Sequence, residues 1–139
     1  MSDPYDLERF VAAQKPVMDE VRRELRQGRK QTHWMWFVFP QIAGLGHSPM
    51  ARRYALRSLA EAGAFLEHPV LGPRLIECTA QVNAVEGRTV HDIFGSPDDM
   101  KFHASMTLFH RARPQKDAFR IALERYFDGR EDLATLRIL

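Results

Sequence analysis

Apolar side chains recur along most of the chain at the spacing of one helix face. The first stripe consists of Leu7, Phe10, Val17, Val21 and Leu25. Pro16 interrupts it, because an interior proline removes a backbone hydrogen bond and clashes with the preceding turn. The pattern therefore predicts one helix near residues 5–14 and a second near 16–27, with Gly28 as the C-terminal cap of the second.

Serine residues near helix starts and a further apolar stripe indicate the helices of the middle region. Ser48-Pro49 places a capping hydroxyl before a first-turn proline, which is typical of a helix start. Ser58 and Glu61 have the spacing of a capping box, so we expect two helices that meet near Arg57. The stripe of the next helix consists of Leu71, Leu75, Cys78, Val82 and Val85.

The C-terminal third carries signals of the same kind. Ser96-Pro97 followed by two acidic residues predicts a capped helix that runs to about Ala112. Thr89 is expected to cap a shorter turn that precedes this helix. Apolar positions between residues 119 and 127 predict the last long helix.

The aromatic segment 32–40 is compatible with two structures. Its alternation and aromatic content favour a strand, whereas a Thr32 cap followed by one or two helical turns is equally consistent with the sequence. Because no partner strand is evident elsewhere, we predict a helix here. The whole pattern then indicates an all-α fold, with six or seven short helices in a single compact domain over residues 1–139.

Composition agrees with this fold and excludes several protein classes. The 139 residues are 45% hydrophobic and 27% charged, which is enough to form a buried core. The longest apolar run, residues 34–39, is far shorter than the roughly 20 residues that cross a membrane. The N-terminus is acidic and lacks the apolar run of a secretory signal. We therefore expect a cytoplasmic protein without a membrane partner.

The net charge of the chain and the absence of known binding motifs narrow the classes of partner further. The formal net charge is only +2, and acidic residues accompany the basic run between Arg22 and Lys30, so nucleic acid is not the favoured partner. P-loop, GxGxxG and HExxH motifs are absent, and the six histidines lack metal-ligand spacing, so we expect neither a cofactor nor a metal. The single cysteine, Cys78, lies on an apolar stripe and is expected to be buried and unreactive.

The first candidate cluster combines cations with both tryptophans of the chain. It consists of Arg29, Lys30, His33, Trp34, Trp36 and Gln41. Guanidinium and ammonium groups bind phosphate or carboxylate, and indole rings stack on flat groups. This combination suits a small anionic or nucleotide-like ligand. The alternative is structural, with the tryptophans as core anchors and the cations at a helix C-terminus.

The second candidate cluster places four ionisable groups within six positions. It consists of Asp98, Asp99, Lys101 and His103. A carboxylate beside a histidine or a lysine can act as a general acid or base. The alternative is that the two acids serve the N-terminus of the predicted helix while the lysine is solvated.

Three long segments resemble the hallmark sequences of a known family. They are GRKQTHWMWFVFPQIAGLG, HPVLGPRLIEC and IFGSPDDMKFHASMTLF. They are similar to the bacterial family called domain of unknown function 1810, whose members are sometimes labelled calpastatin in genomes. The resemblance extends over about residues 6–139 and implies an all-α single domain without an assigned activity. The shared segments 28–46 and 95–109 contain the two candidate clusters.

Three functions are consistent with these clusters. The favoured one is a module that binds a small anionic or nucleotide-like ligand in a cleft between the two shared segments. The first alternative is an enzyme that hydrolyses a glycosidic bond in a nucleotide or an ADP-ribose-like substrate. Its candidate general bases are Asp98 and Asp99, and its candidate proton donors are His33 and His103. The second alternative is a protein-interaction module without a small ligand, which would expose an apolar patch.

Overall fold

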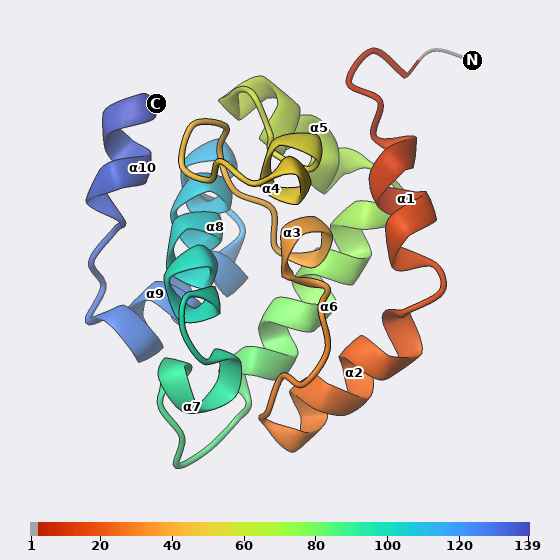
Figure 1. Cartoon of the computed structure of the whole chain (residues 1–139). Coiled ribbons are helices and arrows are strands. Elements are labelled where there is room, and N and C mark those ends of the chain that lie inside the picture. Colours follow the sequence, from red (N-terminus) through yellow and green to blue (C-terminus); the bar gives the residue numbers. More distant parts are fainter. Residues whose placement is uncertain (1–2) are drawn as a thin grey trace.

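The computed structural model describes residues 3–139, which fold into ten helices (Figure 1). They are α1 (Glu8–Gln14), α2 (Met18–Gln27), α3 (Met35–Val38), α4 (Pro49–Arg53), α5 (Leu59–Glu67), α6 (Leu71–Asn83), α7 (Val90–Phe94), α8 (Asp98–Ala112), α9 (Asp117–Phe127) and α10 (Leu133–Ile138). This range contains no β strand, which confirms the all-α prediction, and no helix long and apolar enough to cross a membrane. The helices outnumber the predicted six or seven, and four of them, α3, α4, α7 and α10, have only four to six residues.

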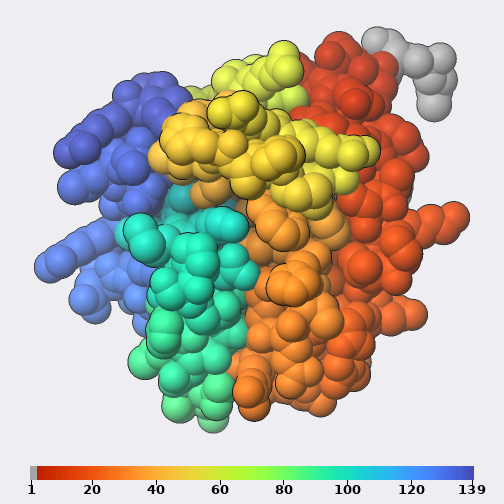
Figure 2. All heavy atoms as spheres, viewed as in Figure 1, coloured from red at the N-terminus to blue at the C-terminus, as the bar shows by residue number. Residues whose placement is uncertain are grey.

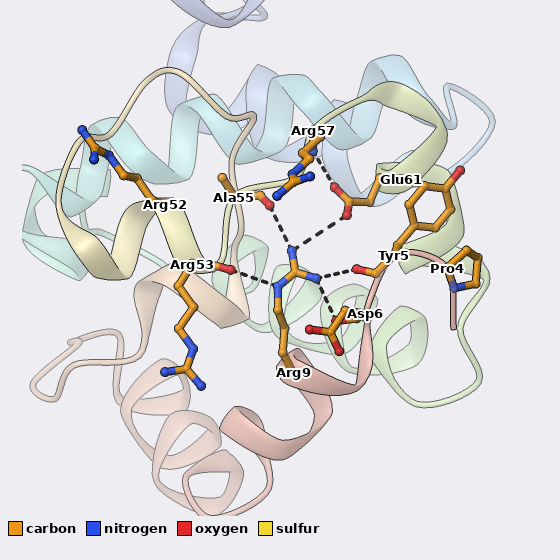
Figure 3. A pocket seen from close by; sticks show the side chains of 9 residues that line it. All are labelled: Pro4, Tyr5, Asp6, Arg9, Arg52, Arg53, Ala55, Arg57 and Glu61. Carbon is orange, nitrogen blue, oxygen red and sulfur yellow. Dashed lines mark hydrogen bonds and ion pairs between the residues drawn. The ribbon is translucent and has the colours of Figure 1, made fainter. Parts of the chain in front are cut away.

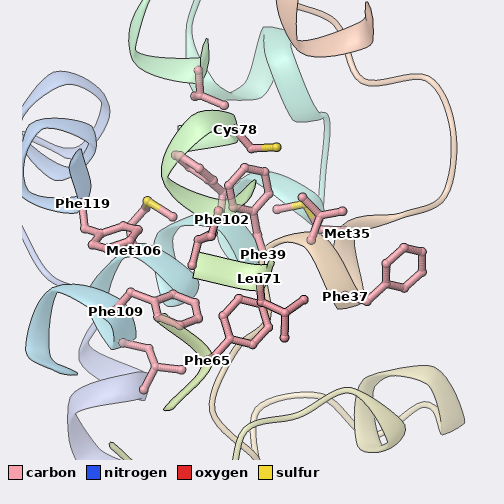
Figure 4. Close-up of a cluster of buried hydrophobic side chains, with 14 of the residues drawn as sticks. Met35, Phe37, Phe39, Phe65, Leu71, Cys78, Phe102, Met106, Phe109 and Phe119 are labelled. Carbon is pink, nitrogen blue, oxygen red and sulfur yellow. The ribbon is translucent and has the colours of Figure 1, made fainter. Parts of the chain in front are cut away.

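The helices α6 and α8 form the centre of the fold. α8 packs against α5, α7, α9 and α10, while α6 packs against α2, α5 and α9. The core between them contains large, fully buried rings, among them Phe39, Phe65, Phe102, Phe109 and Phe119 (Figure 4). The Phe102 ring stacks on Phe94 with centroids 4.7 Å apart and meets Phe39 edge-on at 5.1 Å. These contacts hold the start of α8 against α7 and against the chain that leaves α3.

Four helix ends use the capping residues that the sequence predicts. Gly28 ends α2 with a φ of 71°, a left-handed conformation that favours glycine. The hydroxyls of Ser48 and Ser58 accept backbone N–H groups at the starts of α4 and α5. Thr89 and Asp92 form a capping box at the start of α7. These predicted caps are therefore confirmed.

Two predicted helix starts differ in detail. Pro97 itself occupies the N-cap position of α8, and no side chain caps this helix, so the prediction that Ser96 is the cap was wrong. The Glu61 carboxylate accepts the backbone N–H of Arg57 rather than that of Ser58. Sequence spacing locates a helix start, but the path by which the chain enters the helix decides which N–H each side chain meets.

The aromatic segment 32–40 forms a single helical turn, α3, as predicted. Its N-cap position is Trp34 and not Thr32, because the Thr32 hydroxyl donates to the Glu24 carboxylate at 2.6 Å. Beyond α3, the backbone forms an isolated parallel bridge between Ile42 and Leu56. This bridge holds the loop before α4 against the chain that follows it.

Cys78 is fully buried in α6, as predicted. Burial raises the pKa of its thiol to about 12. The thiol is therefore protonated at neutral pH and has little nucleophilic character.

Candidate functional site

The two candidate segments meet on one face of the molecule. Figure 2 shows the orange segment around residues 30–42 beside the teal first half of α8. Lys30 joins them, because its Nζ lies 2.8 Å from Asp98 Oδ2 and its backbone N–H donates to the Ile93 carbonyl at 2.7 Å. Only 7% of the Lys30 side chain is exposed, so this ion pair belongs to the packed structure.

Glu24 of α2 organises the turn that follows Lys30. Its buried carboxylate accepts four hydrogen bonds of 2.6–3.0 Å, from the backbone of Gln31 and Thr32, the Thr32 hydroxyl and Trp34 Nε1. Burial raises the pKa of this carboxyl, but the hydrogen bonds from Thr32, Gln31 and Trp34 lower it more. The pKa therefore falls from its usual 4.5 to about 2, and the carboxylate is charged at neutral pH.

Trp34 is a core anchor. Its side chain has no exposed surface, and its ring contacts Phe39 with centroids 6.2 Å apart. The Lys30 Nζ lies 5.1 Å from the centroid of the Trp34 ring, which adds a cation–π contact to the Lys30 ion pair. This tryptophan positions Lys30 and presents no surface to a ligand.

Trp36 differs from Trp34, because it is only partly buried and lies beside Lys101. The Lys101 Nζ is 5.2 Å from the centroid of the Trp36 ring and 3.6 Å from Asp98 Oδ1. Asp98 therefore serves two ammonium groups, those of Lys30 and Lys101, which leaves one positive charge in excess. Lys101 is the more exposed of the two lysines, at 24% of its side chain, so the excess charge is accessible there.

A cavity of about 290 Å³ opens next to Lys101, between α8, the loop before α4 and the start of α10. We call it the Lys101 cavity, and its lining consists of Gln41, Leu45, Gly46, Pro97, Met100, Lys101, Ala104, Asp132 and Ala134. Gln41 and Lys101 also border a narrow crevice of about 10 Å³ beside Trp36. Three predicted residues therefore come together. Gln41 and Lys101 line the cavity, and Trp36 lines the adjoining crevice.

Sequence reasoning named Gln41 and Lys101 and missed the other seven residues of this lining, of which Met100 and Asp132 are two. Met100 is 69% exposed and adds apolar surface, and its position directly before Lys101 was a usable signal. Asp132 comes from the start of α10, and no sequence pattern links that part of the chain to α8. The Asp132 carboxylate accepts the N–H and hydroxyl of Thr135 at 3.0 and 2.6 Å, so it is engaged by its own helix.

Arg29, His33 and Asp99 are among the predicted residues that do not line the Lys101 cavity. Arg29 and His33 are exposed, and their side chains form no hydrogen bond or ion pair with other residues in the range 3–139. Asp99 lies 3.2 Å from the Nδ1 of His91. None of the three belongs to the cavity lining.

His103 lies near α9 and the chain that follows it. Its ring stacks on Phe127 with centroids 3.9 Å apart, and its Nε2 lies 2.7 Å from the Arg130 carbonyl oxygen. Since a carbonyl only accepts, Nε2 carries the proton in this contact. Among the described residues, neither candidate histidine forms an ion pair with Asp98 or Asp99.

Comparison with known proteins gives the same family as the sequence resemblance. The family model "Protein of unknown function (DUF1810)" matches residues 4–139. The structure is similar to the crystal structure of the conserved hypothetical protein Rv1873 from Mycobacterium tuberculosis, with 56% sequence identity and a TM-score of 0.97. The match covers 99% of this chain and 98% of that one. No curated protein matches significantly. The chain therefore belongs to the DUF1810 family.

Proposed function

We propose that the protein binds a small anionic, nucleotide-like ligand in the Lys101 cavity. The observation that carries this proposal is the position of the Lys101 ammonium group, which lies 5.2 Å from the Trp36 ring at the edge of a cavity of about 290 Å³. Segments 28–46 and 95–109 contribute jointly, because Trp36 and Gln41 come from the first and Lys101 from the second.

The size and charge of the cavity define the ligand class. Ligand pockets span roughly 300–1,000 Å³, so this one suits a single ring with an acidic group better than a dinucleotide. Lys101 supplies the one ammonium group of the lining, which can bind one carboxylate or phosphate, while the Asp132 carboxylate of the lining accepts hydrogen bonds from Thr135. The Gln41 amide can donate to or accept from polar ring atoms. Leu45 and Met100 supply apolar surface for the flat part of the ligand.

Binding is better supported than glycosidic hydrolysis. A hydrolase needs a carboxylate and a proton donor that flank the same bond. Asp98 is instead paired with two lysines, and Asp99 with His91. His103 donates its proton to a backbone carbonyl. These side chains fix the geometry of the site, and we assign no proton transfer to them.

Nicotinate and AMP are suitable probes, because nicotinate is a single ring with a carboxylate, and AMP is a larger nucleotide with a flat base and one phosphate. A probe that binds only the folded chain stabilises it by about 2.7 kcal/mol at a hundred times its Kd. We expect either probe to raise the unfolding midpoint and to change the tryptophan fluorescence, since Trp36 adjoins the cavity. Lys101→Met should weaken binding at least about tenfold, because it removes the accessible charge.

Lys15→Met is the matched control for this experiment. It removes the same charge from an exposed lysine at the end of α1 that is not part of the cavity lining. We expect its affinity to equal that of the wild type. An equal loss in both variants, or no midpoint shift with either probe at millimolar concentration, would contradict the proposal.

A further inference from the structure

A second cavity, of about 580 Å³, lies where the N-terminal segment meets the chain around α4 (Figure 3). Its charged lining consists of Arg9, Arg52, Arg53, Arg57, Asp6 and Glu61. We call it the arginine cavity. Ala55 lines both this cavity and the crevice beside Trp36, so the two sites are neighbours, but they share no charged residue.

Arg9 shapes the wall of the arginine cavity. Figure 3 shows its guanidinium at the centre, where it donates to backbone carbonyls on both sides. Nη1 donates to the carbonyls of Tyr5 and Asp6. Nε donates to the Arg53 carbonyl at 2.9 Å, and Nη2 donates to the Ala55 carbonyl at 3.1 Å. This side chain therefore fastens the N-terminal segment to the end of α4.

Glu61 neutralises Arg9. The residue is only 3% exposed, and its Oε1 lies 3.8 Å from Arg9 Nη2. Its Oε2 accepts the backbone N–H of Arg57. The buried charges of the arginine cavity therefore cancel, and neither is available to a ligand.

The other three arginines are exposed, and the Arg53 guanidinium lies 5.5 Å from the centroid of the Tyr54 ring. Arg52, Arg53 and Arg57 form no ion pair with any residue in the range 3–139, whereas Arg22 and Arg120 pair with acidic neighbours. Figure 3 shows Arg57 close to Ala55, with Arg52 and Arg53 extending outward from the rim. The three guanidinium groups belong to one cavity lining but extend in different directions, so an anion bound there offsets the repulsion between the arginines that it draws together.

We propose that the arginine cavity binds a small molecule with two neighbouring phosphate groups, of the diphosphate class. Three unpaired guanidinium groups against one remaining carboxylate, that of Asp6, leave two positive charges in excess. Planar guanidinium forks bind pairs of phosphate oxygens. Tyr5 is 36% exposed at the rim, and its ring offers a face for the organic part of the ligand. The cavity volume of about 580 Å³ accommodates such a molecule.

Titration calorimetry with pyrophosphate on the full chain tests this proposal. The triple variant Arg52→Gln/Arg53→Gln/Arg57→Gln should bind pyrophosphate at least about tenfold more weakly than the wild type. Its unfolding midpoint should stay near that of the wild type, because exposed and unpaired side chains contribute little to stability. Raising the salt concentration should weaken the binding by the wild type, since the charges are accessible to solvent.

The matched control is Arg26→Gln/Arg130→Gln/Arg137→Gln. These three arginines are also exposed and form no ion pair in the described part of the chain. The control removes the same total charge, and we expect its affinity for pyrophosphate to change less than about threefold.

Four outcomes would overturn the proposal. The first is an equal loss in both triple variants, which would assign the binding to overall charge. The second is no binding of pyrophosphate by the wild type at low salt. The third is loss of pyrophosphate binding in Lys101→Met, which would place the anion in the Lys101 cavity. The fourth is binding of a single-stranded oligonucleotide, sensitive to the arginine triple variant, without binding of pyrophosphate.

Discussion

The Lys101 cavity and the arginine cavity use cationic side chains in different ways. Beside the first, Lys30 is almost fully buried and paired with Asp98, and Lys101 shares the same carboxylate. In the second, Arg9 alone is committed to the fold, while three further arginines lie exposed without an ion pair in residues 3–139. In the cluster that is most conspicuous in the sequence, Lys30 is thus part of the packed structure, whereas Arg29 is exposed.

The difference follows from how each segment is held in place. The turn after α2 is held by the buried Glu24 carboxylate and by Trp34, and Lys30 is drawn into the same packed region. The helix α4 contains no buried residue, and its arginines therefore point to solvent. Tertiary partners, and not the local density of cations, decide which charges remain available to a ligand.

The largest expected effect comes from Glu24→Ala, which tests whether the Lys101 region depends on this scaffold. The substitution leaves the N–H groups of Gln31, Thr32 and Trp34 without their acceptor, so we expect the free energy of unfolding to fall by about 3 to 5 kcal/mol. Urea denaturation measures it.

Glu20→Ala is the control on the same helix. Glu20 pairs with Arg23 near the surface, so its loss should change stability by less than about 1 kcal/mol. If Glu24→Ala changed stability no more than this control, the turn after α2 would not depend on Glu24. The contrast between the two cavities would then lose its physical basis.

Acid should remove the same stabilisation from the wild type. The pKa of Glu24 in the folded chain is about 2, below its usual 4.5, so the stabilisation is complete above pH 4.5 and is lost as the pH falls towards 2. The shift corresponds to about 3 kcal/mol. The Glu24→Gln variant has no carboxyl that titrates at this position. Between pH 5 and pH 2, its free energy of unfolding should therefore fall by about 3 kcal/mol less than that of the wild type. Parallel pH profiles for the two proteins would contradict the assignment.

The helices could be predicted because their signals are local. Apolar stripes and caps such as Gly28, Ser48, Ser58 and Thr89 act within a few residues, and the structure uses them as expected. Thr32 and Ser96 are exceptions, because Trp34 and Pro97 take the N-cap positions of α3 and α8. The count of six or seven was nevertheless too low, although the Ser48 and Thr89 caps mark the starts of the short helices α4 and α7.

The sites could be predicted only in part, because their residues meet through tertiary contacts. The sequence indicated Trp36, Gln41 and Lys101, whose chemistry is conspicuous, but it could not separate Trp36 from the buried Trp34. The residues of the arginine cavity lie in separate parts of the chain, from Pro4 to Glu61, and no periodic pattern connects them. Only the folded chain shows that Arg9 donates hydrogen bonds to the backbone of neighbouring segments, whereas Arg52, Arg53 and Arg57 form no ion pair within residues 3–139.

Arg9→Lys tests whether Arg9 stabilises the fold more than Arg52, Arg53 and Arg57 do. Lysine keeps the charge but cannot bond the carbonyls of both Arg53 and Ala55 in the geometry of the guanidinium fork. We expect a loss of about 2 kcal/mol in the free energy of unfolding. The triple glutamine variant of Arg52, Arg53 and Arg57 should change it by less than about 0.5 kcal/mol. If the triple variant proved the less stable protein, those arginines would be structural as well.

The smallest expected effect distinguishes the two lysines that share Asp98. Double-mutant cycles with Lys30→Met, Lys101→Met and Asp98→Asn measure each coupling energy by urea denaturation. The Lys30–Asp98 contact is short and nearly buried, so its coupling should be about 1 kcal/mol, whereas the longer, more exposed Lys101–Asp98 contact should give less than about 0.5 kcal/mol. A weak coupling leaves the Lys101 ammonium free to exchange its carboxylate partner for the acidic group of a ligand. A stronger coupling at Lys101 than at Lys30 would reverse this assignment and remove the free charge on which anion binding in the Lys101 cavity depends.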